Sequence, residues 1–427
     1  MKRAICLAGG GPAAGLHVGV LEGLKNCGIT FDNKDDVWAL SCIGAWVGVV
    51  YNQAESEKSD GKLNETYNFF RGVFRDDRSF DSFPTNTIFA PDWFGNAEAL
   101  LDFMLEPRNY RKAFLPTKLL ESFAYTMKAI NRRMKSGDLF DEGDFNRWTL
   151  NHVLAVNPAV RFLTAMIYKS SVDGLAKLYY PDSTFLRKLN FKNLYSEDKP
   201  YLFHNAWNLS CQELRLFSNK REKYDDKGRP YKPITAGSLC ACSALPYIEQ
   251  TVEIEGDIYC EGALVDTVNF KDLLKDHPEL DEIWISRIVD ADQVRAPNNL
   301  HDSLANLCEL FAATVGEDDV KLFKYHVMCG EIGEEASDSR DRWKGTIIEI
   351  PVNSDINFEW SHSNLERGRT NGAIAAEQAY KLYKSKEKDP NKPLVVGAVS
   401  KEQRMQQIRE QRIAAGLGDR KDRAARR

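Results

Sequence analysis

The stretch that decides the fold is Trp38-Ala39-Leu40-Ser41-Cys42-Ile43-Gly44-Ala45-Trp46-Val47-Gly48. Its pattern predicts a short buried strand, a tight turn at Cys42 and an apolar helix that begins at Ile43. A strand, a sharp turn that carries a nucleophilic side chain and a following helix together form a nucleophile elbow. Because a cysteine at the N-terminus of a helix has a lowered pKa, we expect an enlarged thiolate fraction at Cys42. The alternative is that Cys42 is one of the buried small residues of the core.

A glycine run precedes the elbow, with the sequence Leu7-Ala8-Gly9-Gly10-Gly11-Pro12-Ala13-Ala14-Gly15. Consecutive glycines let backbone N–H groups converge, and the N-terminus of the next helix adds partial positive charge. Such a loop binds a phosphate group or the oxyanion of an acyl-transfer intermediate. The dinucleotide-binding pattern is matched poorly because Ala14 occupies its last glycine position. A nucleotide or phosphate binder is therefore kept only as an alternative.

Composition places the chain among globular proteins with a sizeable core. Its 427 residues are 43% hydrophobic and 28% charged, and the formal net charge is -5. Nine scattered cysteines favour a reducing compartment over a disulfide framework. Neither a run of about eighteen apolar residues nor a secretory signal is found, so we expect a cytoplasmic protein. No cofactor or metal is expected, because the seven histidines and the pair Cys240 and Cys242 lack metal-binding spacing.

Alternating short strands and helices predict an α/β fold, a three-layer sandwich around a mainly parallel sheet. Strands are expected at Arg3–Leu7, Val37–Ser41, Tyr201–Leu209, Glu213–Phe217, Gln250–Glu255, Asp257–Cys260, Glu282–Ile288 and Gly345–Ile350. Helices are expected at Leu115–Met134, Asn146–Val156, Ala236–Leu245, His301–Met328 and Ser363–Lys384. We expect one domain over residues 1–395, with a helical, aromatic-rich insertion at about 55–199. The insertion is interpreted as a cap over the substrate or as ordinary core.

The last part of the chain, residues 396–427, is expected to be a basic tail, flexible or helical. Between Lys401 and Arg427 it carries nine Lys and Arg against four Asp and Glu, so this segment has a charge of +5. A solvated tail is one interpretation. The other is a basic element that contacts an anionic membrane surface, a nucleic acid or an acidic partner, of which a peripheral membrane contact is the one we expect. No nucleic acid partner is expected.

Four motifs in the chain resemble, in order, those of the patatin-like phospholipase family. Gly9-Gly10-Gly11 is similar to its oxyanion loop, and Cys42–Gly48 resembles its nucleophile elbow, with cysteine where the family has serine. Ala241–Pro246 resembles the helix that precedes the acidic motif. Glu261-Gly262-Ala263 is similar to that motif, which normally begins with aspartate. The resemblance covers most of residues 1–385.

This resemblance implies a catalytic dyad without histidine, in which a carboxylate takes the proton of the nucleophile and the glycine loop stabilises the oxyanion. Cys42 would be the nucleophile, and Glu261 its base or orienting carboxylate. The implied oxyanion hole is formed by backbone amides of Gly9, Gly10, Gly11 and Ile43. The chain departs from the family pattern at both dyad residues, at Leu40 in place of the first elbow glycine, and at Ala13 in place of a loop arginine.

Three further residues are candidates for an accessory role. His17 lies on the first predicted helix near the glycine loop, and its alternative is a hydrogen-bonded core histidine. Ser41 is a rival nucleophile by adjacency, although the register set by Gly44 and Ala45 places it one residue early. Asp266 is interpreted as a turn residue or an orienting carboxylate.

The sequence therefore predicts an acyl hydrolase or acyltransferase that acts on lipid or other acyl esters or thioesters. It would work as an esterase or phospholipase does, through an acyl-enzyme on Cys42. A thioester intermediate is attacked readily by amines and thiols, so acyl transfer competes with hydrolysis. The alternative is a catalytically silent protein of the same fold that binds a lipid or a protein partner.

Overall fold

The computed structural model describes residues 1–82, 93–108, 173–177, 185–220, 223–224, 228–270, 272–290, 294, 296–329, 343–351 and 358–397, with isolated residues between 109 and 172. The chain divides into two compact units. Unit 1 comprises Met1–Phe89, Leu178–Pro246 and Thr251–Arg427, and unit 2 comprises Ala90–Lys177 and Tyr247–Gln250.

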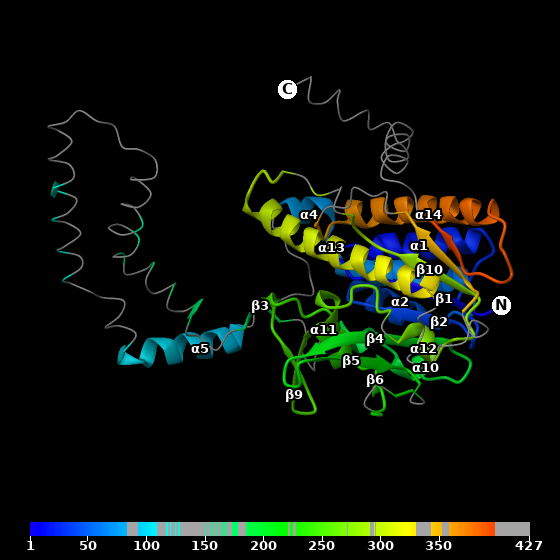
Figure 1. Ribbon diagram of the computed structural model, residues 1–427. Helices are drawn as coiled ribbons and strands as arrows, with labels where there is room; N and C mark the ends of the chain where they lie inside the picture. The colour runs from blue at the N-terminus through cyan, green and yellow to red at the C-terminus, as the bar shows by residue number, and fades with distance from the viewer. Residues whose placement is uncertain are drawn as a thin grey trace, which may run out of the picture. The chain divides into compact units, whose positions relative to one another are not determined.

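Within the described residues, ten strands of unit 1 form one sheet (Figure 1). They are β1 (Arg3–Leu7), β2 (Val37–Leu40), β4 (Tyr201–Asn208), β5 (Glu213–Ser218), β6 (Lys232–Pro233), β8 (Val252–Ile254), β9 (Asp257–Glu261), β10 (Glu282–Ser286), β11 (Thr346–Ile350) and β12 (Leu394–Val396). The order is β12-β11-β10-β1-β2-β4-β5-β6, and β9 pairs with both β4 and β8. The pairs from β12 to β4 are parallel, whereas β5 and β9 run antiparallel to β4. The predicted mainly parallel sheet is confirmed.

The helices of unit 1 cover both faces of this sheet. They are α1 (Ala14–Asn26), α2 (Ile43–Gln53), α3 (Ser59–Val73), α4 (Asp77–Ser82), α10 (Phe191–Leu194), α11 (Ala236–Cys242), α12 (Leu273–Asp276), α13 (Leu300–Cys329) and α14 (His362–Lys384), with short 3-10 turns at Leu186–Lys188 and Gly262–Leu264. Alternate strand residues belong to two hydrophobic clusters. Ile5 and Trp38 pack with residues of α1, α2 and α14, whereas Cys6 and Ala39 pack with α12 and α13. The predicted three-layer arrangement is therefore observed.

Helices α1 and α14 approach each other closely and lie side by side (Figure 1). Glycines recur at every fourth position on one face of α1. A Cβ atom at Gly15 would lie 2.1 Å from the carbonyl oxygen of Leu365, and one at Gly19 would lie 1.9 Å from that of Arg369. Gly372 faces Leu16 in the same way from α14. Only glycine allows this backbone contact, which fixes α1, and the glycine loop before it, against α14.

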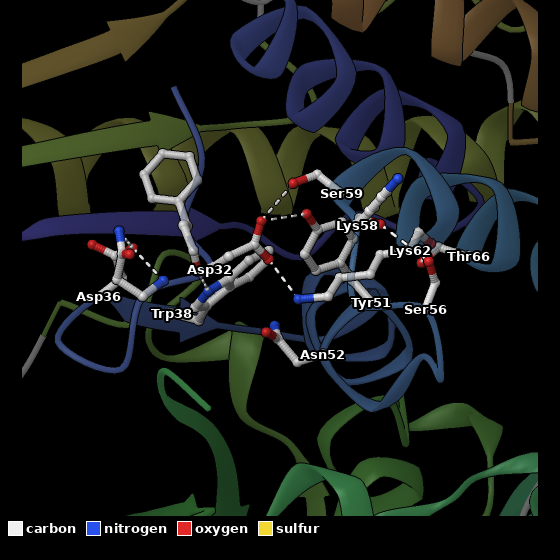
Figure 2. A network of polar contacts seen from close by, with 12 residues as sticks. Asp32, Asp36, Trp38, Tyr51, Asn52, Ser56, Lys58, Ser59, Lys62 and Thr66 are labelled. Carbon is white, nitrogen blue, oxygen red and sulfur yellow. Dashed lines mark hydrogen bonds and ion pairs between the residues drawn. The ribbon is translucent and has the colours of Figure 1, made fainter. Parts of the chain in front are cut away.

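A polar network fixes the far end of α2, away from the elbow (Figure 2). The Asp32 carboxylate accepts hydrogen bonds from Ser59 Oγ and from Lys62 Nζ, both at 2.7 Å, and from the hydroxyl of Tyr51 at 3.3 Å. Burial, together with the Asp32 charge, raises the pKa of Tyr51 above its usual value. The network joins α2 and α3 to the loop before β2.

Unit 2 contains, within its described residues, α5 (Trp93–Leu105) and the parallel strands β3 (Gly174–Ala176) and β7 (Tyr247–Glu249). The predicted helices Leu115–Met134 and Asn146–Val156, and the tail 396–427, lie almost wholly outside the described residues. The domain limits 1–395 and 55–199 stay predictions.

Most of the remaining predicted elements are confirmed, with their ends within two residues of the predicted ones. Helix α11 is the exception: it ends at Cys242, three residues earlier than predicted. The reason is Pro246, which disfavours helical backbone at the residue before it. Among the described helices, none is long and apolar enough to cross a membrane.

Candidate active site

The turn between β2 and α2 has the geometry of a nucleophile elbow. Cys42 stands between them with φ 47° and ψ -120°, a conformation that non-glycine residues rarely adopt. The next turn of backbone packs closely on β1, because a Cβ atom at Gly44 would lie 2.1 Å from the carbonyl oxygen of Leu7. Glycine at position 44 is thus a steric requirement of the elbow.

Leu40, which stands in place of the first glycine of the elbow, is accommodated by a second glycine. Its side chain is fully buried. Gly48 lies on α2 one helical turn after Gly44. A Cβ atom at Gly48 would lie 2.6 Å from both Cδ atoms of Leu40. The leucine therefore fills space that Gly48 leaves open, and the turn keeps its shape.

Cys42 and Glu261 meet across the end of the sheet. Glu261 is the last residue of β9, which pairs antiparallel with β4. The thiol of Cys42 donates a hydrogen bond to the Glu261 carboxylate, and the backbone N–H of Gly10 donates one to Cys42 Sγ. The two side chains are 7% and 6% exposed. The nucleophile, the carboxylate and one amide of the glycine loop therefore converge on one sulfur atom.

The protonation of this pair differs from the sequence expectation. Burial, followed by the negative charge of Glu261, raises the pKa of the Cys42 thiol well above its usual value. The lowered pKa expected for a helix N-terminus is wrong, because desolvation and the carboxylate outweigh the helix dipole. Burial also raises the pKa of Glu261 to about 7, although its hydrogen bond from Cys42 acts in the opposite direction. At rest the thiol is protonated, and Glu261 exchanges its proton near neutral pH.

The three loop glycines have different surroundings. The N–H of Gly9 donates to the carbonyl of Thr267 at 3.1 Å and so anchors the loop. Gly11 has φ 61°, and a Cβ atom there would lie 2.4 Å from the ring of Phe358. The side chain of Ile288 packs in the same way against Gly10. These contacts hold the loop in place while the Gly10 amide points at the nucleophile.

Three consecutive residues at the C-terminal end of α11 bind the elements that carry the dyad. Cys242 Sγ accepts the backbone N–H of Cys42 at 3.0 Å. Ser243 Oγ accepts the indole N–H of Trp46 at 3.2 Å. The carbonyl of Ala244 accepts the backbone N–H of Glu261 at 2.9 Å. The sequence analysis did not identify Cys242 as a site residue, although it lies inside one of the four motifs.

Ser41 and Asp266 lie beside the dyad in a separate hydrogen-bond network. The Ser41 hydroxyl donates to Asn205 Oδ1 at 3.0 Å, and Asn205 Nδ2 donates to the carbonyl oxygen of Asp266 at 2.7 Å. The Asp266 carboxylate accepts the N–H of Asn269 at 2.6 Å. These residues brace the elbow against the chain that follows Glu261.

His17 lies beneath the glycine loop and is fully buried. One ring nitrogen bonds the carbonyl of Ala8 at 2.9 Å, and the other bonds the hydroxyl of Ser286 at 3.0 Å. Burial lowers its pKa to about 4, so the ring is neutral. The histidine thereby links the start of the loop to β10.

Helix α13 borders the site, which sequence reasoning did not anticipate. Burial and the negative charge of Glu261 raise the pKa of Cys308 on this helix. Asp319 accepts the N–H of Thr267 at 2.8 Å, and burial together with Asp266 raises its pKa to about 7. No sequence motif marks either residue, because both act through contacts with distant segments. Within the described residues, no group of three or more His, Cys, Asp or Glu is arranged to hold a metal ion.

A family model described as patatin-like phospholipase matches residues 5–274, which include the glycine loop, Cys42 and Glu261. A comparison with curated proteins finds no match.

The solved structures that are similar to this chain include the following two. VipD from Legionella pneumophila has a TM-score of 0.34 and 13% identity, covering 89% of this chain and 66% of that one. Human GIVD cytosolic phospholipase A2, in complex with methyl gamma-linolenyl fluorophosphonate, has a TM-score of 0.31 and 12% identity, covering 88% of this chain and 57% of that one. This chain thus spans less than two thirds of the length of either protein.

Proposed function

Because the chain belongs to the patatin-like phospholipase family, we propose that it is an acyl hydrolase or acyltransferase with Cys42 as its nucleophile. The family supports a lipid acyl hydrolase activity. The observation that carries the finer proposal is the convergence of the Glu261 carboxylate and the Gly10 N–H on Cys42 Sγ. A base and an oxyanion donor beside one nucleophilic atom are the parts that acyl transfer needs.

The reaction begins with attack of Cys42 Sγ on the acyl carbonyl while its proton moves to Glu261. Backbone amides of Gly10, Gly11 and Ile43 hold the oxyanion of the tetrahedral intermediate. The Gly9 amide supports the loop instead, since it donates to Thr267. As the intermediate collapses, Glu261 returns the proton to the leaving alcohol or thiol, and Cys42 is left as a thioester. Water, an amine or a thiol then attacks the thioester while Glu261 takes its proton. Collapse of this second intermediate breaks the C–S bond, releases the acyl group and returns the proton to Cys42 Sγ.

A thiol nucleophile in place of serine directs the choice of substrate. Its thioester is more open to amines and thiols than an ester is, and a thiolate, which is a weaker base than an alkoxide, suits acyl donors that have a good leaving group. Acyl thioesters and activated esters, including those of lipids, are therefore the proposed donors. Ser41, Asp266 and His17 are proposed to position the elbow and the loop.

Turnover of paired donors tests this proposal. We expect the native chain to cleave an acyl thioester and the matching nitrophenyl ester, and Cys42→Ala to cleave neither. Cys42→Ser forms an ester acyl-enzyme from either donor, so its acyl transfer to an added amine or thiol should fall more than its hydrolysis. Cys211→Ala removes an exposed thiol and is the control for adventitious acylation. Absence of turnover from the folded native chain would favour the silent binding protein.

The basic tail carries a separate proposal, a peripheral contact with anionic membrane surfaces. It rests on the charge of +5 between Lys401 and Arg427. Sedimentation with anionic and zwitterionic vesicles, with and without these residues, decides it. Salt-sensitive binding that needs both the anionic lipid and the tail would support the contact, and equal binding of both chains would refute it.

A further inference from the structure

Cys242 is a fully buried thiol that the proposed reaction does not use. Its sulfur accepts the backbone N–H of Cys42, the residue at the centre of the elbow, at 3.0 Å. The next two residues also accept hydrogen bonds: Ser243 Oγ from the indole N–H of Trp46, and the carbonyl of Ala244 from the backbone N–H of Glu261. The nucleophile, its helix and its base are thus bound by one short segment. Of these three residues, Cys242 is the one that is bonded to the nucleophile residue itself.

The backbone of Cys42 needs such a support. A residue with φ 47° occupies a sparsely populated conformation and keeps it only when its surroundings impose it. The amide of Cys42 is buried with the rest of the residue, and a buried N–H without a partner is costly. Without the Cys242 acceptor, the Ser41–Cys42 peptide would gain by turning toward another acceptor. Such a rotation would carry Cys42 Sγ away from Glu261 and the Gly10 amide.

The start of α11 makes Cys242 a fixed support. Thr235 and Ser238 form a capping box, in which each side chain accepts a backbone N–H at the first turn. The residues from Leu239 to Cys242 are fully buried. The acceptor is therefore built into a short, anchored helix whose last residue faces the elbow.

We propose that Cys242 is a positioning residue for the Cys42 nucleophile, holding the strained elbow through a hydrogen bond from the Cys42 amide to its sulfur. This inference rests on the proposed function of Cys42. Cys242 itself receives no acyl group. Its side chain acts only as a buried acceptor, and any side chain of similar size with an acceptor atom should serve.

Acylation kinetics of three variants test the catalytic consequence. Cys242→Ala removes the acceptor, and we expect the rate of Cys42 acylation to fall roughly 10- to 100-fold with KM changed less than about twofold. Cys242→Ser keeps an acceptor and should retain activity within about threefold of native. Cys240→Ala removes a sulfur that is equally buried, two residues earlier on the same helix, and controls for lost packing. Equal loss in the alanine and serine variants, or no loss in either, would overturn the inference.

Amide hydrogen exchange, read by NMR on protein with 15N-labelled cysteines, tests the contact without relying on activity. The Cys42 amide should exchange slowly in the native chain and in Cys242→Ser. In Cys242→Ala it should exchange at least about tenfold faster, while the other cysteine amides of the core keep their rates. Unchanged protection at Cys42 in the alanine variant would refute the support. If the native chain formed no acyl adduct but Cys42 lost protection on this substitution, the proposed function would fail and the structural support would stand.

Discussion

The thiol of Cys42 donates a hydrogen bond to the carboxylate of Glu261, and both side chains are more than nine-tenths buried. Desolvation favours the uncharged form of each group, so the two pKa values rise together. The carboxylate keeps the lower of the two and is the proton acceptor. Above neutral pH the resting dyad is therefore thiol and carboxylate, and the thiolate forms only as the proton moves during attack.

The rate of acylation should depend on pH through Glu261. With its pKa raised to about 7, the carboxylate is protonated below neutral pH and cannot accept the proton of Cys42. We expect the rate to rise through an inflection near pH 7 and then level off. Glu261→Gln should lower it by roughly 100- to 10,000-fold and abolish the inflection. Stopped-flow acylation over a pH series measures both. A native profile that is flat across neutral pH would contradict the role of Glu261 as base.

The same carboxyl group should make folding stability fall as pH rises. Its pKa is about 7 when folded and near its usual 4.5 when unfolded, so the folded state binds more protons in between. Its favourable contribution is complete below pH 4.5 and is lost as pH rises through 7, by about 3 kcal/mol. Asp319, whose pKa is also raised to about 7, and His17, whose pKa is lowered to about 4, add their own pH dependence. The contribution of Glu261 is therefore the difference between the native chain and Glu261→Gln in urea unfolding at both ends of this window. Glu261→Gln should remove it, whereas Glu197→Gln, at an exposed position, should leave it unchanged. Equal pH dependence in all three chains would contradict the raised pKa.

Backbone strain at the elbow predicts that two inactive variants differ in stability. Cys42→Gly and Cys42→Ala both remove the sulfur, but only glycine adopts φ 47° without steric cost. The glycine variant should have a free energy of unfolding about 1 kcal/mol above that of the alanine variant. Chemical denaturation compares them directly. A more stable alanine variant would show that the elbow is not strained.

The glycine contact between α1 and α14 predicts a large effect from one methyl group. A Cβ atom at Gly19 would meet the carbonyl oxygen of Arg369, so Gly19→Ala should destabilise the fold by about 2 kcal/mol or more. Gly72→Ala is the matched control in α3, where nothing lies within 4 Å of the added atom. It should instead stabilise by about 0.5 to 1 kcal/mol, through helix propensity. Thermal unfolding of both variants tests the contact, and similar melting temperatures would argue against it.

Local sequence signals were sufficient to predict the strand, turn and helix of the elbow. A short apolar run, a nucleophile and Gly44 predict strand, turn and helix because each depends on neighbours in the chain. The partners of Cys42 are different, since Cys242 and Glu261 reach it from distant segments. Only the resemblance to a family brought Glu261 to the site, and Cys308 on α13 had no motif to mark it. The direction of the Cys42 pKa shift was also beyond local reasoning, because it is decided by burial and by a carboxylate from another strand.

The measurement that tests the central claim most directly is the intact mass of the native chain after incubation with a slow acyl thioester, followed by peptide mapping. The account predicts a single acyl adduct on Cys42. It predicts no adduct in Cys42→Ala and a strongly slowed one in Glu261→Gln. A folded native chain that acquires no adduct, or one whose adduct maps to another residue and persists in Cys42→Ala, would contradict it.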